Sequence, residues 1–273
     1  MEFKYFSKNG KILPTAEAVI PLSNIEYQYG FGVYENVRVQ SGIPYFLDDH
    51  IQRLVESARA IGLTHSFSEV NIKKSIAELI KKNGDGTYNL KVLLIGGKES
   101  ALYIVCLNPL FPDKKLYTEG ADFVTYEYER PFPHAKTLNM LQSYLAYKNA
   151  KETDCYDALL INGKGCITEG TRTNFLLLRG RTLVSAPESE ILLGVTRKAV
   201  LKVAKENGFS LEERELRFSD IINSDGAFVT STSSKIVPVR SIDGHALATA
   251  PDALRELMEL FEEFLQNYKG KLT

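Results

Sequence analysis

Hydrophobic and polar positions recur along the chain at spacings that predict several helices. Between residues 48 and 63, apolar side chains recur three or four positions apart and charged ones fill the other side, which indicates an amphipathic helix. A second apolar stripe begins behind Ser68 and Glu69 and stops at Asn83-Gly84, which are typical helix-start and helix-stop residues. Further helices are predicted over residues 141–150, 194–206 and 251–268.

Short apolar runs between turn residues predict the strands. Residues 90–95 and 102–107 are two such runs, and Gly96-Gly97 separates them. Strand-like runs then alternate with turns in the second half of the chain, at residues 121–128, 158–161, 175–178, 229 and 236–239.

A linker is predicted between these two groups of elements. Residues 108–112 contain two prolines and lead into the polar Asp113-Lys114-Lys115, a composition typical of a domain boundary. We therefore predict an α/β (α+β) fold with a small α/β domain over residues 1–112 and a larger pseudo-barrel domain over residues 113–273. Clefts between such domains commonly bind ligands, so we expect a ligand there.

Composition narrows the classes of function. With a formal net charge of −1, the chain has no electrostatic reason to bind nucleic acid or an anionic membrane. No apolar run approaches the roughly 20 residues that cross a bilayer, and the first residues lack the apolar core of a signal peptide. The three cysteines and four histidines form neither a disulfide framework nor a metal-binding spacing. We expect a cytoplasmic protein that holds no metal.

Four short segments could carry chemistry, and each has an ordinary structural alternative. Gly30-Phe31-Gly32 allows close backbone approach but also makes common turns. The helix start at Leu193-Gly194-Val195-Thr196 suits a phosphate, although Gly194 could be a plain N-cap. The hydroxyl run 230–234 could bind an anion or form an exposed loop. Glu169 could pair with a buried cation or be a solvated turn acid. Alone, these segments indicate a phosphate-ligand enzyme and no more.

Six motifs follow one another between about residue 24 and residue 244. They are Gly30-Phe31-Gly32-Val33-Tyr34-Glu35, His50-Ile51-Gln52-Arg53-Leu54, Lys136-Thr137-Leu138-Asn139-Met140-Leu141, Thr168-Glu169-Gly170 with Asn174-Phe175, Leu193-Gly194-Val195-Thr196-Arg197, and Ser231-Thr232-Ser233 with Pro238-Val239. In this order the sequence resembles the class IV aminotransferases, also called fold type IV of the pyridoxal-phosphate enzymes. That family includes branched-chain aminotransferases, D-amino-acid aminotransferases and aminodeoxychorismate lyase.

The resemblance implies pyridoxal 5′-phosphate as the cofactor, a homodimer, and a role for each matching residue. Lys136 is the implied catalytic residue, whose amine would bind the cofactor aldehyde and then carry a proton between substrate and cofactor. Glu169 would bond the pyridine nitrogen, and Leu192 would pack on the ring. The phosphate would be held by Arg53, Val195, Thr196, Ser231 and Thr232. The substrate would be bound by Tyr34, Thr232 and Ser233.

Two positions that usually carry a substrate-binding arginine in this family are apolar here. Ile95 stands where D-amino-acid aminotransferases and the lyase have it, and Leu90 stands where branched-chain enzymes have it, with Lys98 and Arg130 as potential replacements. The resemblance therefore implies transfer of an amino group between an apolar L-amino acid, of the branched-chain type, and a 2-keto acid. The alternatives are a D-amino-acid aminotransferase, a lyase of the aminodeoxychorismate type and, remotely, a non-catalytic binding protein on the same fold.

Overall fold

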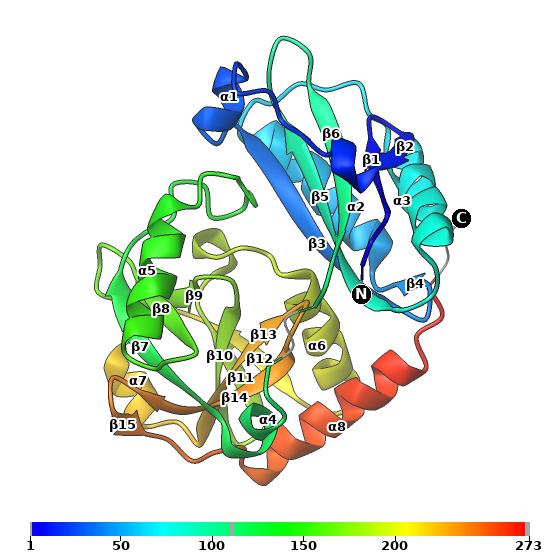
Figure 1. Ribbon diagram of the computed structural model, residues 1–273. Coiled ribbons are helices and arrows are strands. Elements are labelled where there is room, and N and C mark those ends of the chain that lie inside the picture. The colour runs from blue at the N-terminus through cyan, green and yellow to red at the C-terminus, as the bar shows by residue number, and fades with distance from the viewer. Residues whose placement is uncertain (1, 110–111, 271–273) are drawn as a thin grey trace. The chain divides into compact units, whose positions relative to one another are not determined.

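The computed structural model describes residues 2–109 and 112–270, which form two compact units (Figure 1). The first unit is Met1–Leu110, His134–Met140 and Tyr268–Thr273, and the second is Phe111–Pro133 and Leu141–Asn267. This division differs from a single boundary after residue 112, because His134–Met140 and Tyr268 make their contacts with the first unit. Residues 110 and 111 of the predicted linker lie outside the described residues.

The first unit is built on a six-stranded sheet whose neighbouring strands are all antiparallel (Figure 1). Along the sheet the strands follow the order β2-β1-β6-β5-β3-β4. Their bounds are β1 Tyr5–Lys8, β2 Lys11–Pro14, β3 Gly32–Gln40, β4 Ile43–Pro44, β5 Thr87–Ile95 and β6 Ala101–Leu107.

Two helices pack on one face of this sheet. They are α2 (Leu47–Ala60) and α3 (Glu69–Asn83), and the unit also contains the short η1 (Thr15–Glu17) and α1 (Ile25–Gln28). Val33 of β3, Leu54 of α2 and Ile76 of α3 are all fully buried in the shared core. Fully burying one such side chain contributes about 1.5–3 kcal/mol, so the apolar stripes hold the helices on the sheet.

The second unit contains a nine-stranded sheet that closes on itself. Its strands follow the order β12-β11-β10-β13-β14-β7-β8-β9, with β15 beside β14. Because Glu169 of β9 also pairs with Asn174 of β10, strands β10, β13, β14, β7, β8 and β9 form a closed barrel, which confirms the predicted pseudo-barrel. The bounds are β7 Ala121–Glu127, β8 Asp157–Ile161, β9 Ile167–Gly170, β10 Asn174–Arg179, β11 Thr182–Ser185, β12 Ser210–Glu213, β13 Gly226–Ser231, β14 Lys235–Ile242 and β15 His245–Ala246.

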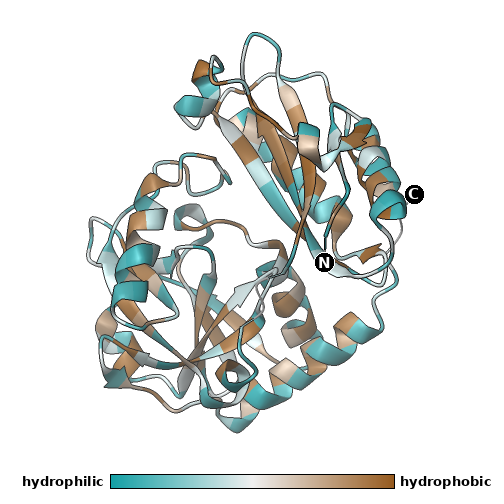
Figure 2. Cartoon of the chain, viewed as in Figure 1, coloured by the Kyte–Doolittle hydropathy of each residue, from teal (hydrophilic) through white to brown (hydrophobic). Residues whose placement is uncertain are grey.

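The last helix of the second unit, α8 (Asp252–Gln266), is amphipathic. In α8, Leu254, Leu257, Phe261 and Leu265 are buried, and Figure 2 shows hydrophobic and hydrophilic positions alternating along this helix. No helix within the described ranges is long and apolar enough to span a membrane. The bounds are α4 Lys115–Glu119, α5 Leu141–Glu152, η2 Glu188–Glu190, α6 Val195–Glu206, α7 Phe218–Ile222 and α8 Asp252–Gln266.

The long periodic helices and most of the predicted strands are found, whereas some short exposed elements were not predicted. Helices α2, α3, α5, α6 and α8 lie where the apolar stripes predict them. Ser68 caps α3 as expected, since its hydroxyl accepts the backbone N–H of Asn71 at 3.2 Å. By contrast, β12 was not predicted, because all four of its residues are exposed and leave no apolar pattern to detect.

Candidate active site

Lys136 lies in a loop that is hydrogen-bonded to the start of β3. The backbone N–H of Tyr34 donates to the carbonyl of Lys136 at 2.9 Å, and the N–H of Leu138 donates to the carbonyl of Gly32 at 2.8 Å. A Cβ atom on Gly32 would meet the side chain of Leu138 at 2.7 Å, and Gly30 has a φ of +68°. The Gly-x-Gly segment therefore serves a close approach between two parts of the chain, the β3 strand and the lysine loop.

The side chain of Lys136 lies against an aromatic ring. Its Nζ is 4.7 Å from the centroid of the Tyr34 ring. Its backbone N–H donates to Oγ of Ser57, on α2, at 3.1 Å. The main chain is thus fixed by both β3 and α2, while the side chain stays half-buried. A lysine nucleophile needs this combination of a fixed main chain and a reachable amine.

A buried carboxylate orders the face of α2 that carries Ser57. Glu35 is 0% exposed, its Oε1 accepts Nε–H of Arg53 at 2.6 Å, and its Oε2 accepts Nη2–H of Arg53 at 2.8 Å. The same Oε2 lies 2.7 Å from Nδ1 of His50. His50, Arg53 and Ser57 follow one another at helical spacing, so they share one face of α2. Glu35 therefore fixes the guanidinium one turn away from the residue that holds Lys136.

These neighbours change the ionisation of the buried groups. Burial alone would raise the pKa of Glu35, but the charges and hydrogen bonds of Arg53 and His50 outweigh it and lower that pKa to about 2. Burial lowers the pKa of His50, although Glu35 opposes the shift. The cluster thus contains an ionised carboxylate that accepts two hydrogen bonds from one arginine. Such charge-assisted hydrogen bonds are strong where water is excluded.

The low pKa of Glu35 predicts a loss of stability in acid. The carboxyl titrates near 4.5 when exposed and near 2 in the folded protein, so its stabilisation is complete above pH 4.5 and disappears as the pH falls toward 2. A difference of this size corresponds to about 3 kcal/mol. His50 acts in the same direction, because a depressed folded pKa makes protonation below 6.5 favour the unfolded chain. We expect the urea midpoint of the wild type to fall steeply over this range.

Two variants isolate the contribution of Glu35. In Glu35→Gln the midpoint should start lower and fall less steeply below pH 4.5, because the group that titrates is gone. Glu78→Gln removes an exposed carboxylate from α3 and should follow the wild-type curve. Parallel curves for Glu35→Gln and the wild type would refute the buried ionised carboxylate.

Glu169, in the second unit, is held where the barrel closes. It is 2% exposed. Its Oε2 accepts the side-chain amide of Asn174 at 3.2 Å and the backbone N–H of Leu192 at 3.1 Å, and its Oε1 accepts Nη1–H of Arg130 at 3.1 Å. Asn174 also donates to the carbonyl of Leu192 at 2.8 Å. Glu169 is therefore a buried, ion-paired carboxylate, which excludes the alternative of a solvated turn acid.

The start of α6 lies beside the same asparagine. Gly194 is the N-cap residue, and within the described residues no side chain caps this helix. A Cβ atom on Gly194 would meet Oδ1 of Asn174 at 1.9 Å, so the approach requires glycine. Val195 and Thr196 in the first turn are buried. An uncapped helix start supplies N–H donors and a positive dipole end, so it suits an anion.

The hydroxyl run at the end of β13 is ordered and leaves one polar atom without a partner. Oγ of Ser231 lies 2.6 Å from Oγ of Ser234 and accepts its backbone N–H at 3.1 Å. Oγ1 of Thr230 is buried, and no described residue hydrogen-bonds it. Thr230 pairs with Asn174 across β13 and β10. Asn174 in turn pairs with Glu169 of β9, so these hydroxyl groups and Glu169 lie on either side of β10. A buried hydroxyl without a partner and a carboxylate in the same sheet fit the polar groups of pyridoxal phosphate.

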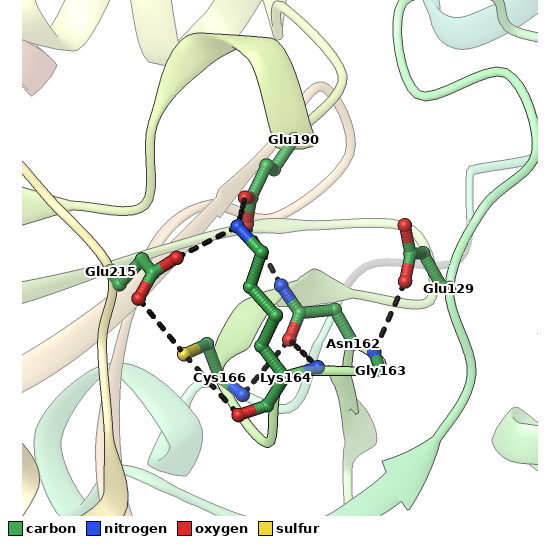
Figure 3. Close-up of polar contacts among 7 residues, drawn as sticks. All are labelled: Glu129, Asn162, Gly163, Lys164, Cys166, Glu190 and Glu215. Atoms are coloured by element: carbon green, nitrogen blue, oxygen red, sulfur yellow. Dashed lines mark hydrogen bonds and ion pairs between the residues drawn. The ribbon is translucent and has the colours of Figure 1, made fainter.

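A polar cluster surrounds Asn162 and Lys164, just before β9 (Figure 3). In the turn between β8 and β9, Oδ1 of Asn162 accepts the backbone N–H groups of Lys164 and Cys166, each at 3.0 Å. Nζ of Lys164 lies between Glu215 at 2.8 Å and Glu190 at 3.2 Å. The cluster fixes the hairpin that leads into β9. Among the residues that the structure describes, no group of three or more His, Cys, Asp or Glu could hold a metal ion.

The pairing of β3 with β5 determines which β5 residues lie on the same face of the sheet as Tyr34. Tyr88 and Leu90 are 0% exposed and belong to the core beneath α2 and α3. Leu90 therefore points away from the face that carries Tyr34. The family resemblance had placed Leu90 where branched-chain enzymes carry a substrate-binding arginine. Antiparallel pairing puts Leu93 opposite Tyr34 and Lys91 two residues along on the same face.

The family model for class IV aminotransferases matches residues 32–242 of this chain. The chain belongs to the class IV aminotransferases. The D-alanine aminotransferase of Bacillus licheniformis is 34% identical over 259 residues, which cover 90% of this chain and 91% of that protein. This membership confirms the predicted family and the assignment to the pyridoxal-phosphate-dependent aminotransferases.

Solved structures of this family have the same fold. The branched-chain amino acid aminotransferase of Escherichia coli matches with a TM-score of 0.87 at 22% identity, covering 98% of this chain and 95% of that one. The enzyme of the same name from Thermobaculum terrenum, solved in its PLP-form, matches with a TM-score of 0.86 at 24% identity, covering 96% and 94%. The predicted two-part fold type IV architecture is thereby confirmed.

In this class IV aminotransferase the predicted site residues fall into two sets. Those of the first unit are Tyr34, Arg53 and Lys136. Those of the second unit are Glu169, Leu192, Val195, Thr196, Ser231, Thr232 and Ser233. Their individual roles remain predictions.

Two residues of this geometry, Glu35 and Arg130, were not predicted in the positions where the structure places them. Glu35 could have been found from β3, where it interrupts the core-facing series Val33, Val37 and Val39 with a charge. Arg130 had been considered as a replacement for a substrate arginine, but it is bound to Glu169 instead. No local pattern in the sequence links Arg130 to Glu169, because the two residues are 39 positions apart.

Proposed function

We propose that this class IV aminotransferase transfers the amino group of an apolar amino acid to a 2-keto acid through Lys136, with pyridoxal 5′-phosphate as its cofactor. The observation that carries the proposal is the position of Lys136. Its main chain is tied to β3 and to Ser57 of α2, and its amine lies against Tyr34. This lysine also occupies the family motif that begins at Lys136.

The cofactor, when bound, supplies an electron sink for the charge that develops as the substrate loses its α-proton. Lys136 would hold the cofactor, and its amine would accept the proton that the substrate α-carbon loses. Glu169, which is buried and ion-paired with Arg130, would accept a hydrogen bond from the pyridine nitrogen and favour its protonated form. Leu192 covers one face of the ring.

The remaining site residues hold the two anionic groups. Arg53 and the N–H groups of Val195 and Thr196 bind the phosphate, together with the hydroxyls of Ser231 and Thr232. Tyr34 and the N–H groups near Thr232 and Ser233 bind the substrate carboxylate.

The preferred substrate in this proposal is an apolar L-amino acid of the branched-chain type. The apolar residues Ile95 and Leu93, near Tyr34 on β5, support it. A D-amino acid such as D-alanine is the second candidate, and the relative with that activity in its name, at 34% identity, favours it.

A half-reaction tests this function. We expect holoprotein mixed with one amino acid, and no keto acid, to release one equivalent of keto acid per site and stop. Adding a 2-keto acid should restart it, because the amino group needs an acceptor. Comparing kcat/KM for L-leucine, D-alanine and D-aspartate identifies the preferred substrate. Continuous turnover without an acceptor would indicate a lyase, and no release with any amino acid would indicate a binding protein.

We also propose that the protein works in the cytoplasm as a homodimer. Several large apolar residues of the first unit are exposed, Leu22 at 91% and Tyr29 at 75% among them. Exposed apolar residues clustered in one segment are typical of an interface. Light scattering of the purified protein measures its mass, and a monomer at micromolar concentration would refute the dimer.

A further inference from the structure

The face of the first-unit sheet that points away from α2 and α3 carries several polar residues. Side chains alternate between the two faces of a strand, so Tyr34 and Asn36 of β3 lie opposite to the core residues Val33 and Val37. In the antiparallel pair, Lys91 of β5 stands directly opposite Asn36. This face of the sheet therefore brings a lysine close to Tyr34.

Lys91 and Lys136 contact the same aromatic ring. Nζ of Lys91 lies 5.2 Å from the centroid of the Tyr34 ring, and Nζ of Lys136 lies 4.7 Å from it. The two ammonium groups are therefore no farther apart than the sum of these distances. Like charges repel, and an aromatic face attracts each cation only weakly. An anion at this place would offset the charge of Lys91, whose amine stays free when Lys136 binds the cofactor.

No acidic partner for Lys91 exists among the described residues. The other cations considered for the substrate differ in this respect. Arg130 binds Glu169, and Lys98 is exposed in the turn after Ile95. Lys91 is half-buried, so its charge is less screened than that of Lys98. A half-buried cation beside the reactive lysine, with no counter-ion of its own, is well suited to a ligand anion.

We propose that Lys91 binds the distal carboxylate of a dicarboxylic substrate, a five-carbon amino acid or its 2-keto acid, and so supplies the positive charge that positions 90 and 95 lack. The proposal rests on the proposed function, because it takes Lys136 as the reactive lysine. The substrate α-carbon must reach Lys136, and its α-carboxylate stays beside that carbon. A chain of this length then extends along the Tyr34 ring and brings its second carboxylate to Lys91.

This arrangement explains how one site serves two kinds of substrate. Lys91 has a flexible stem, so its ammonium group can move toward solvent when an apolar side chain enters. The apolar residue Leu93, directly opposite Tyr34, then contacts that side chain. An apolar donor and a dicarboxylic acceptor can therefore alternate at the same face of the sheet.

Binding of inhibitors that lack an amino group tests the proposal without catalysis. Holoprotein is titrated with glutarate, which has two carboxylates, and with butyrate, which has one, by calorimetry or by the cofactor absorbance. In Lys91→Met we expect glutarate to bind about ten- to hundredfold more weakly and butyrate to bind as in the wild type, since one charge-assisted hydrogen bond is lost. The matched control Lys98→Met removes an exposed charge of the same unit and should change neither.

The kinetics should show the same split. In Lys91→Met, KM for glutamate or its keto acid should rise while kcat/KM for leucine stays unchanged. Lys91→Arg keeps the charge and should retain the preference for glutarate.

Equal weakening of glutarate and butyrate would overturn the proposal, because it would assign Lys91 to the carboxylate that both share. An equal effect in Lys98→Met would overturn it too. Absence of any half-reaction in the wild type would instead refute the proposed function, and the comparison of glutarate with butyrate would still decide the role of Lys91.

Discussion

Replacing Lys136 by alanine is expected to slow keto acid release in the half-reaction by about 10³-fold or more, because the residue supplies both the nucleophile and the proton carrier. The fold should survive, since the contacts that fix this loop are made by its main chain. Those contacts are the hydrogen bonds to Tyr34 and to Ser57. Rapid mixing of holoprotein with the preferred amino acid measures the rate.

The control for this variant is Lys98→Ala. Lys98 is an exposed lysine of the same unit, so its loss should leave the half-reaction unchanged. Added primary amines should partly restore the rate of Lys136→Ala, because they replace the missing amine. A rate within tenfold of the wild type in Lys136→Ala would assign the chemistry to another residue.

Glu169→Gln is expected to slow α-proton removal by about 10²- to 10³-fold, the usual effect of removing one preorganised electrostatic group. An amide cannot keep the ring nitrogen protonated, so the cofactor becomes a weaker electron sink. The amide would also leave Arg130 without its carboxylate partner. Cofactor binding should be largely retained, since the phosphate is held elsewhere.

Two measurements separate a catalytic effect from a structural one. The rate with α-deuterated substrate should show a larger isotope effect in Glu169→Gln, because proton removal becomes more limiting. Glu259→Gln, which removes an exposed carboxylate of α8, should behave like the wild type. A near-normal half-reaction in Glu169→Gln would mean that the buried carboxylate serves only to close the barrel.

Local patterns predicted much of the fold, and the contacts that complete it are not local. The stripes of α2, α3, α6 and α8 are visible because each helix buries one face. The closure of the barrel depends on one pair, Glu169 with Asn174, at the ends of β9 and β10. Exposed β12 and the short α1 offer no such signal, because neither buries a residue.

The candidate site was predictable as a set of motifs and less so as a geometry. The family motifs identify Lys136 and Glu169, but the ion pair between Glu169 and Arg130 spans residues that no spacing rule connects. The prediction and the structure differ most usefully in which residues of β5 face the core. Alignment to the family's arginine position pointed to Leu90, whereas the pairing of β3 with β5 turns Leu90 into the core and Lys91 toward Tyr34. A shift of one residue exchanges the two faces of a strand.

The central claim is that Lys136 is the residue that binds the cofactor covalently, and borohydride reduction of the holoprotein tests it most directly. Reduction makes the bond between lysine and cofactor permanent, and the labelled peptide is then identified by mass spectrometry. We expect one label per chain, on the peptide that contains Lys136. A label on any other lysine, or no label on a protein that retains bound pyridoxal phosphate, would contradict the claim.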